Sequence, residues 1–570
     1  MKFYKKTIFF ILIFVSVISL SSCTYLNTII SIARKNKLPK TEITVNYYVD
    51  DNLYKTETTK NRSDFQYPEN PTKEGYNFGG WTYSESYQTL EPSDFLYYDI
   101  TELDLYAYFS KGTHFSDNLK YNGPEISKAV MPSFGKPNIL VVPLTLGGTH
   151  TEKMLDEIKI AFSGTSEQTG FESVNSFYYK SSNGRLDIQF DFMDDWFKPQ
   201  NSKDYYGQYD SKKDRYGDYG TGVIYNEILR AYDSVIDFSK YDNDEDGFID
   251  GIWFIYDIMP EYFSEDRVWW AYVTSTYNTS RKYDGCYPRN YANASYYFMH
   301  EYETEKRYGI KLEKYDMSDI TIDAHTYIHE TGHLLGLNDY YDNDQTKGGS
   351  GGVYGAGMMD ANCGDLNTVD KLLLGFADPY VVSTTLGTVT TKTVEIGAFE
   401  DTGEFILVAK NNPKSIYSEY FLIELYTNTG LNTHDIPISK PASLLPINPI
   451  NIYPSYGIRI LHVNASLTKE YNGKTYSFPV DFTYNNSTTK TLFVDTLVNS
   501  KKGIVRNTDT NSDYLDIRAL YYETGVDYDL MSSDFKMANG SNLFFNFKID
   551  SISSEKATIT FTLMGGIIWN

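Results

Sequence analysis

The short segment from His329 to Asp339, which reads HETGHLLGLND, constrains the fold of this chain more than any other stretch. Because an α-helix turns once every 3.6 residues, His329 and His333 would lie on one face, one turn apart. Two imidazoles at that spacing can occupy adjacent corners of a zinc tetrahedron, each about 2.0–2.1 Å from the metal. Gly336 permits a left-handed backbone, which ends the helix and turns the chain. The segment therefore predicts a helix, a bend and a metal centre in direct succession.

The other polar residues of this segment complete the hypothesis. Glu330 lies beside the two histidines, where its carboxylate can take a proton from a metal-bound water. The turn at Gly336 can bring Asp339 to the metal as a third ligand, which leaves one position open for water. The alternative is an ordinary core helix whose histidines are satisfied by hydrogen bonds. Because the chain has only 8 His in 570 residues, we favour the metal centre. His325 lies one turn before His329, but Glu330 is correctly placed only for the pair 329 and 333, so we expect His325 to be a neighbour and not a ligand.

A second acidic segment, DNDEDGFID at positions 242–250, predicts a calcium-binding loop. Calcium takes six to eight oxygen ligands, which a loop can provide from alternate positions when glycine stands at the sixth. Trp253 occupies the twelfth position in place of glutamate, so the loop is not a complete EF-hand. A solvated acidic turn is the alternative, but carboxylates this close repel one another unless a cation neutralises them. The expected ligands of this structural calcium ion are Asp242, Asp244, Asp246, the main-chain carbonyl of Phe248, and Asp250.

The zinc motif also carries a resemblance to a known family. From His329 to Asp339 it resembles the metzincin clan of zinc peptidases, and within that clan the immune inhibitor A-like secreted metallopeptidases, whose motif ends in aspartate. The resemblance implies a zinc endopeptidase in which Glu330 is the general base. It also favours Asp339 over Asp342 as the third ligand, although Asp342 could replace it or bind a second cation.

Two further segments add to the resemblance. The residues GAGMMD at 355–360 resemble the Met-turn of that family, a hydrophobic base beneath the metal. Met359 is the better candidate for that base, with Met358 next. The segment 173–187 resembles the region that precedes the edge strand, which in that family pairs with an extended substrate. Read without the family, the same segment predicts an aromatic core helix followed by a hairpin.

The first residues predict export and a lipid anchor. Three lysines precede an apolar run at 8–20, which is too short for a comfortable membrane-spanning helix and is typical of a secretory signal. Leu-Ser-Ser-Cys at 20–23 resembles the bacterial lipobox, which implies cleavage before Cys23 and attachment of lipid to its thiol. The alternative is a plain signal peptide with an incidental cysteine. We expect a signal peptide at 1–22 and a tether at 23–40.

The next segment, 41–112, predicts a small β domain. Apolar residues alternate from Ile43 to Val49, and further strands are expected near 53–59 and 103–109. Composition alone predicts a small antiparallel domain. The Gly-Gly-Trp at 79–81 and the whole span resemble an internalin-type B repeat, a β-grasp module that implies a spacer or adhesion role. A linker is expected at 113–136.

The rest of the chain predicts an α+β fold. A buried strand at 139–144, a helix near 151–162 and a strand at 252–256 belong to an expected metzincin-like catalytic domain at 137–380, a mixed twisted sheet plus the active-site helix. The Tyr- and Asn-rich segment 284–298 is expected to be an irregular insertion. Alternating strands from about 380 onward predict a C-terminal β-sandwich at 381–570, so the catalytic domain is flanked by this sandwich and by the N-terminal β-grasp repeat.

Composition limits the partners. A net charge of −24 argues against nucleic-acid binding, because phosphate backbones attract the opposite sign. The 53 tyrosines favour β-rich domains, and 570 residues suffice for about three of them. Cys286 and Cys363 could form a disulfide or remain two buried thiols. Without a C-x-x-C motif, cysteine ligation of the metal is not expected.

These observations predict a monomeric zinc endopeptidase, lipid-anchored on the extracellular face of a bacterial membrane, that hydrolyses extracellular proteins or peptides. The cofactors expected are catalytic Zn²⁺ and structural Ca²⁺. One alternative is a surface adhesin with an inactive peptidase-like domain, which predicts the loss of Glu330 or of a ligand. Another is a metal-dependent hydrolase of non-peptide substrates.

Overall fold

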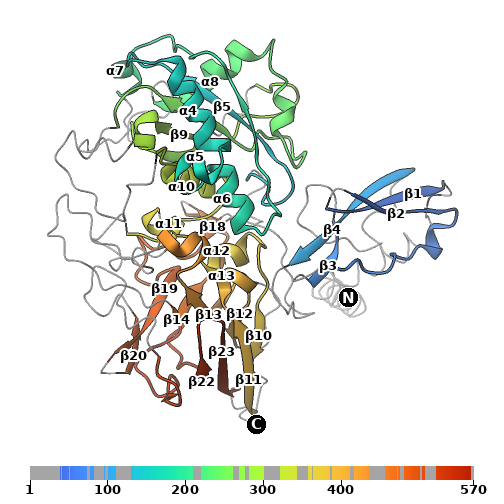
Figure 1. The fold of residues 1–570 in the computed structure, drawn as a ribbon, viewed down its shortest axis with the longest axis vertical. Helices are drawn as coiled ribbons and strands as arrows, with labels where there is room; N and C mark the ends of the chain where they lie inside the picture. The colour runs from blue at the N-terminus through green and yellow to red at the C-terminus, as the bar shows by residue number, and fades with distance from the viewer. Residues whose placement is uncertain are drawn as a thin grey trace, which may run out of the picture. The chain divides into compact units, whose positions relative to one another are not determined.

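The computed structural model describes residue 39 and most of the chain from 41 to 565 (Figure 1). Within that span it leaves out 51, 74–76, 83–95, 97–99, 111–129, 209–219, 261–268, 277–280, 301–320, 343–352, 354–356, 363, 385–387, 411–415, 435–455, 472, 476–480, 501–502 and 507–521. Cys23, the predicted signal peptide and Cys363 therefore lie outside the described residues. The chain divides into two compact units, of which the first comprises Met1–Thr72, Phe78–Ser84 and Gln88–Phe109, and the second comprises Lys73–Asn77, Glu85–Tyr87 and Ser110–Asn570.

In the described part of the first unit, four strands form a mixed sheet in the order β2-β1-β4-β3. The central strands β1 and β4 are parallel, whereas β1 and β2 are antiparallel, so composition alone was wrong in predicting a purely antiparallel domain. The core contains Trp81, Tyr47 and Leu105. The elements are β1 (Ile43–Val49), β2 (Asn52–Thr59), η1 (Arg62–Asp64), β3 (Asn77–Thr82) and β4 (Glu102–Ser110).

The second unit begins with a sheet whose described strands have the order β6-β5-β7-β9-β8. Four of these strands are parallel, and β8 is antiparallel at one edge. The strands are β5 (Asn138–Leu144), β6 (Gln189–Phe192), β7 (Ile252–Tyr256), β8 (Tyr272–Ser275) and β9 (Asn290–Ser295). All residues of β7 are buried, as its continuous apolar sequence predicts for a strand covered on both faces.

Strand β9 corrects one expectation. It is a fully buried strand next to β7, in the segment 284–298 that was predicted to be an irregular insertion. Its two asparagines gave no apolar signal, but each forms a side-chain hydrogen bond to the neighbouring strand β8. The Asn293 amide donates to the carbonyl of Tyr272 at 3.1 Å, and the Ser275 hydroxyl donates to Asn290 Oδ1 at 2.6 Å. A polar sequence can therefore form a buried strand when its partners lie far away in the chain.

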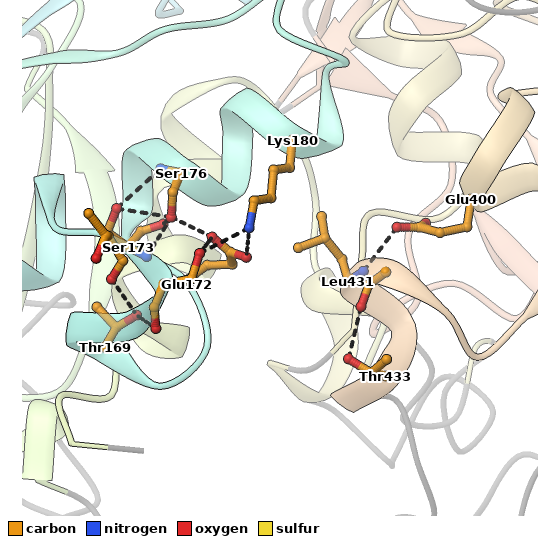
Figure 2. Close-up of polar contacts among 11 residues, drawn as sticks. Thr169, Glu172, Ser173, Ser176, Lys180, Glu400, Leu431 and Thr433 are labelled. Atoms are coloured by element: carbon orange, nitrogen blue, oxygen red, sulfur yellow. Dashed lines mark hydrogen bonds and ion pairs between the residues drawn. The ribbon is translucent and has the colours of Figure 1, made fainter. Parts of the chain in front are cut away.

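Helices cover this sheet and begin at local capping residues. Helix α4 (Glu152–Ser163) starts at Thr151, whose hydroxyl accepts from the main chain, close to the predicted helix. Helix α6 (Val174–Ser181) starts at a capping box formed by Ser173 and Ser176, shown in Figure 2 beside the Glu172–Lys180 ion pair. The other elements are α5 (Ser166–Thr169), α7 (Lys203–Tyr206), α8 (Thr221–Tyr232), η2 (Phe238–Tyr241), η3 (Tyr296–His300), α10 (His325–Leu334), α11 (Met358–Ala361) and α12 (Thr368–Leu373).

The C-terminal part of the second unit contains two sheets that share one apolar core. Among the described residues their orders are β10-β12-β13-β14-β19-β20 and β11-β23-β22-β21. Ile406 and Phe421 from the first sheet and Phe545 and Ile559 from the second belong to this core. The bounds are β10 (Tyr380–Ser383), β11 (Val389–Gly397), α13 (Phe399–Thr402), β12 (Phe405–Ala409), β13 (Glu419–Thr427), η4 (Gly430–His434), β14 (Tyr456–Asn464), β15 (Leu467–Thr468), β16 (Glu470–Tyr471), β17 (Lys474–Thr475), β18 (Asp481–Phe482), β19 (Val494–Ser500), β20 (Gly503–Arg506), β21 (Asp527–Tyr528), β22 (Phe545–Ile552) and β23 (Lys556–Met564).

The α+β class predicted from the sequence is confirmed, because helices and several sheets coexist in the second unit. In the part of the chain that the structure describes, no helix has both the length and the apolar character needed to cross a bilayer. The architecture places α10 against β9, α6 and α11, so the segment with the zinc motif lies inside the second unit.

Candidate metal centre

Helix α10 carries the zinc motif and ends where the sequence predicts. Its last residue is Leu334, and Gly336 follows with a φ of 92°, the left-handed conformation that glycine adopts without strain. His329 is 3% exposed, and Glu330 is 6% exposed. The bend after Gly336 returns the chain so that Asp339 faces the two histidines.

Main-chain carbonyls orient both imidazoles. The Nδ1 of His329 donates to the carbonyl of Met358 at 2.8 Å, and the Nδ1 of His333 donates to the carbonyl of Leu337 at 2.8 Å. Because a carbonyl can only accept, the proton of each neutral ring lies on Nδ1. Both Nε2 atoms are therefore left with a lone pair directed at the same point, as is usual for histidines that bind a metal.

The third donor completes a cluster. His329 Nε2 lies 3.0 Å and His333 Nε2 lies 3.1 Å from Asp339 Oδ1. Within the described residues, these three side chains form one of two groups whose ligand atoms all lie within 4.8 Å of one another. Ligands at 2.0–2.1 Å around a tetrahedral zinc ion are roughly 3.3 Å apart. Two nitrogens and one carboxylate oxygen at nearly that spacing fit a zinc ion with a fourth position for water.

The charges of the cluster are strongly coupled. Burial raises the pKa of Asp339, but hydrogen bonds and charge from His329 and His333 outweigh it and hold that pKa well below its usual range. Burial lowers the pKa of His333, but the contact with Asp339 outweighs it and raises the pKa to about 9. A proton on His333 thus supplies positive charge beside the carboxylate of Asp339, as a metal cation would. A metal that binds between these side chains must displace that proton.

Glu330 has the environment expected of a proton acceptor. Its Oε2 atom is buried and has no hydrogen-bond partner within the protein. Burial is the main cause that raises the pKa of its carboxyl, and the charges of His333 and His329 oppose the shift. A buried carboxylate without a donor is costly in a purely structural role, so this atom is available to a water or a substrate.

The residues predicted to form a Met-turn lie in contact with α10. The carbonyl of Met358 holds His329, and Met359 packs so close to Gly332 that a Cβ at Gly332 would lie 2.4 Å from the Met359 sulfur. Met359 is fully buried. Both methionines therefore contact the helix, Met359 through its side chain and Met358 through its main chain.

Tyrosines around the centre were missed by the sequence reasoning. The Tyr178 hydroxyl donates to the carbonyl of Ile328 at 2.7 Å inside α10. The ring of Tyr341 lies nearly parallel to that of His329, with 6.2 Å between centroids. Burial, then the charge of Asp339, raises the pKa of Tyr341. The only available signal was its position two residues after Asp339.

Two neighbouring groups lie outside the cluster of three donors. His325 Nδ1 lies 2.6 Å from Asp323 Oδ1, and its ring stacks on Phe171 with 4.5 Å between centroids. Asp342, the alternative third ligand, is likewise not one of the grouped residues. The geometry therefore brings together the three side chains that the motif selects, His329, His333 and Asp339.

The acidic loop forms the second group of possible ligands. Asp242, Asp244 and Asp246 place one carboxylate oxygen each within 4.8 Å of the others. Gly247 has a φ of 88° and donates its N–H to Asp242 Oδ2 at 3.0 Å, which closes the loop. The Oδ1 atom of Asp242 is buried without a hydrogen-bond partner. Three convergent carboxylates and an unsatisfied oxygen fit a hard cation such as calcium.

Asp250, another predicted calcium ligand, is not one of these three grouped side chains. Asp250 is fully buried; its Oδ2 accepts from the main chain and the side chain of Asn243, and its Oδ1 has no partner. Burial, followed by the charge of Asp244, raises the pKa of Asp250 well above its usual value. The N–H of Phe248 donates to Asp246 Oδ1 at 3.0 Å. Cys286 is a buried thiol that donates to Asp242 Oδ2 at 3.2 Å, a contact that sequence spacing gives no means to predict.

No model of a protein family matches the chain. A search of curated proteins finds no match either. What the second unit can do therefore follows from its residues and their geometry.

Proposed function

We propose that this protein is a zinc-dependent endopeptidase. The observation that carries the proposal is the convergence of His329 Nε2, His333 Nε2 and Asp339 Oδ1, with the buried, unpartnered carboxylate of Glu330 on the same helix. Three ligands leave a fourth position for water, which distinguishes catalytic from structural zinc sites. An inactive adhesin would not require Glu330.

The mechanism assigns distinct tasks to these side chains. When bound, zinc supplies a Lewis acid that polarises the scissile carbonyl and acidifies a water molecule. Glu330 accepts the proton of that water through its unpartnered Oε2 and then delivers the proton to the leaving amine. Met358 and Leu337 keep the imidazoles oriented through their carbonyls. Burial of the centre limits competing solvent and strengthens these electrostatic effects.

The sheet supports a polypeptide substrate and a metzincin-like fold. Helix α10 packs against β9 and against β8, the antiparallel edge strand of the five described strands. The outer edge of such a strand can pair with an extended peptide through main-chain hydrogen bonds. The strand that follows 173–187 is β6, at the other edge of the five described strands, whereas β8 is the edge that packs against α10. A peptide held along β8 would lie beside α10, so we propose pairing at β8 in place of β6, with extended segments of proteins as the substrates.

The remaining parts of the proposal concern location and a second cation. The loop around Asp242 holds a structural Ca²⁺. Cys23 carries a lipid that anchors a monomer on the outer face of the membrane, and the first unit is a spacer. The substrates are extracellular proteins or peptides.

The direct test compares wild type with Glu330→Gln in casein zymography and in a fluorogenic peptide assay, with zinc content measured on both proteins. We expect Glu330→Gln to retain zinc and to lose activity about 10²–10⁴-fold, because only the proton acceptor is removed. Glu172→Gln is the matched control, since Glu172 is also buried but pairs with Lys180 and is not one of the grouped ligand residues.

The outcomes separate the candidates. Equal activity of wild type and Glu330→Gln would overturn the mechanism. Stoichiometric zinc without cleavage of any protein or peptide would favour the adhesin or a hydrolase of other substrates. Absence of zinc from the wild type would remove the enzyme proposal altogether.

A further inference from the structure

Tyr340, the residue after the third ligand, connects the metal centre to the C-terminal sheets. Its main-chain N–H donates to the carbonyl of Met359 at 3.1 Å, and its hydroxyl donates to Asp370. Its ring packs against Phe493, with 6.1 Å between centroids and an angle of 27°. Tyr340 is fully buried. The residue that fixes the direction of Asp339 is therefore held from several sides at once.

Asn486 supplies the contact to the Tyr340 carbonyl. Its Nδ2 donates to that carbonyl at 2.9 Å and to the Val494 carbonyl at 3.0 Å, while its Oδ1 accepts from the Val494 N–H at 3.1 Å. These partners use both amide hydrogens and the amide oxygen, and they permit only one orientation of the side chain. Asn486 is 1% exposed. Because Val494 begins β19, the amide ties the ligand segment to a strand of the C-terminal sheet.

A second asparagine reaches the Met-turn in the same way. Asn432, in η4, accepts through Oδ1 from the N–H of Asp365 at 3.1 Å, and its Nδ2 donates to the Thr427 carbonyl at 3.2 Å. The carbonyl of Asp365 accepts from the N–H of Met358 at 3.2 Å. The main-chain carbonyl of Met358 in turn accepts from His329 Nδ1. The C-terminal part therefore braces two of the three ligands, Asp339 through Tyr340 and His329 through Asp365 and Met358.

We infer that Asn486 and Asn432 are positioning residues of the metal centre, and that the C-terminal β region is part of the metal-binding unit. The inference rests on the proposed zinc site. Asn486 acts on Asp339 through Tyr340, and Asn432 acts on His329 through Asp365 and Met358. Residues that orient metal ligands commonly contribute 10–100-fold to metal affinity. Loss of either amide would let one ligand move away from the common point.

The test measures zinc affinity of the full chain by competition with a chromophoric chelator, at a temperature well below unfolding. Asn486→Ala is expected to weaken zinc binding roughly 10-fold or more and to lower kcat more than it changes KM. The matched control is Asn464→Ala. Asn464 is equally buried, and its amide donates at 2.8 Å to the Leu492 carbonyl within the β region.

A purely structural role predicts a different pattern, in which both variants lower the melting temperature and neither changes zinc affinity. That pattern would overturn the inference while leaving the proposed function intact. If Asn486→Ala does not fold, Phe493→Leu keeps an apolar side chain but removes the ring that contacts Tyr340, and it should weaken zinc binding in the same assay. Unchanged affinity in Phe493→Leu would then reject the inference. Failure of wild type to bind zinc would instead reject the proposed function.

Discussion

At the scale of single residues, the packing around the metal centre requires a residue without a side chain at position 332. Gly332 lies between the two histidines of α10, where the helix passes over Met359. The hydroxyl of Tyr178 approaches the same place and would lie 3.1 Å from a Cβ at Gly332. The sequence alone predicted the two histidines and the methionine, because each belongs to a motif. It did not predict why glycine stands between the histidines, since that depends on the approach of Met359 and Tyr178.

We predict that Gly332→Ala lowers the free energy of unfolding by about 1–3 kcal/mol, the typical effect of overpacking in a core. The added methyl group would push Met359 away, because its sulfur lies only 2.4 Å from the new Cβ. Chemical denaturation measures the change. Gly222→Ala in α8 is the control, since the nearest atom to its Cβ is the Tyr291 hydroxyl at 3.3 Å. If Gly332→Ala destabilises the Met359→Ala variant as much as it destabilises wild type, the contact between Gly332 and Met359 is not the cause.

At the scale of helices and strands, the sequence predicted the elements whose apolar patterns are strong. Strands β5, β7 and β14 and helix α4 lie where alternation or continuous apolar runs place them. Strand β9 was missed because its asparagines form hydrogen bonds to β8, which no local pattern reveals. The sequence also gave no signal for the buried charged residues where α12 and α13 meet. There the buried ion pair of Lys371 with Asp365 lies next to Glu400, whose contact with the N–H of Leu431 appears in Figure 2.

This junction predicts how stability depends on pH. Burial, reinforced by the charge of Asp365, raises the pKa of Glu400 from 4.5 to about 8. Between those values the folded protein binds a proton that the unfolded chain releases, so stability falls as pH rises, by at most about 1.4 kcal/mol per pH unit. Glu400→Gln should therefore raise the melting temperature at pH 9 relative to wild type, but not at pH 5.

Melting curves from pH 5 to 9 test this expectation. Glu395→Gln removes a negative charge at an exposed position paired with Lys556 and serves as the control. The same pH dependence in wild type and Glu400→Gln would assign the effect to another group.

At the scale of the whole molecule, the second unit joins segments that the sequence suggested as separate domains. The contact between Asn486 and Tyr340 spans 146 residues, so no local pattern could predict it. Motif spacing did predict that His329, His333 and Asp339 approach one another, because they lie within one helix and its bend. The acidic loop is an intermediate case, since spacing predicted the convergence of three aspartates but not the nearby thiol of Cys286.

We predict that Ca²⁺ raises the melting temperature of the second unit by a few degrees and leaves that of the first unit unchanged. The cation would relieve repulsion among Asp242, Asp244 and Asp246, and a ligand at 100 times its Kd stabilises a fold by about 2.7 kcal/mol. Calorimetry with saturating zinc, with and without added Ca²⁺, measures the shift. Asp244→Asn should reduce the response. An equal response to Mg²⁺ would argue against a calcium-specific loop.

The two carbonyls that hold the imidazoles, those of Met358 and Leu337, have a consequence for the choice between cations. They fix two nitrogen donors at one spacing, and Asp339 adds a single oxygen. Magnesium requires six oxygens in nearly octahedral array and loses its hydration reluctantly, so this arrangement offers it little. Ions that accept imidazole and four-fold coordination are favoured instead. The imidazoles would discriminate between metals, and two peptide groups that never touch the ion would hold those imidazoles in place.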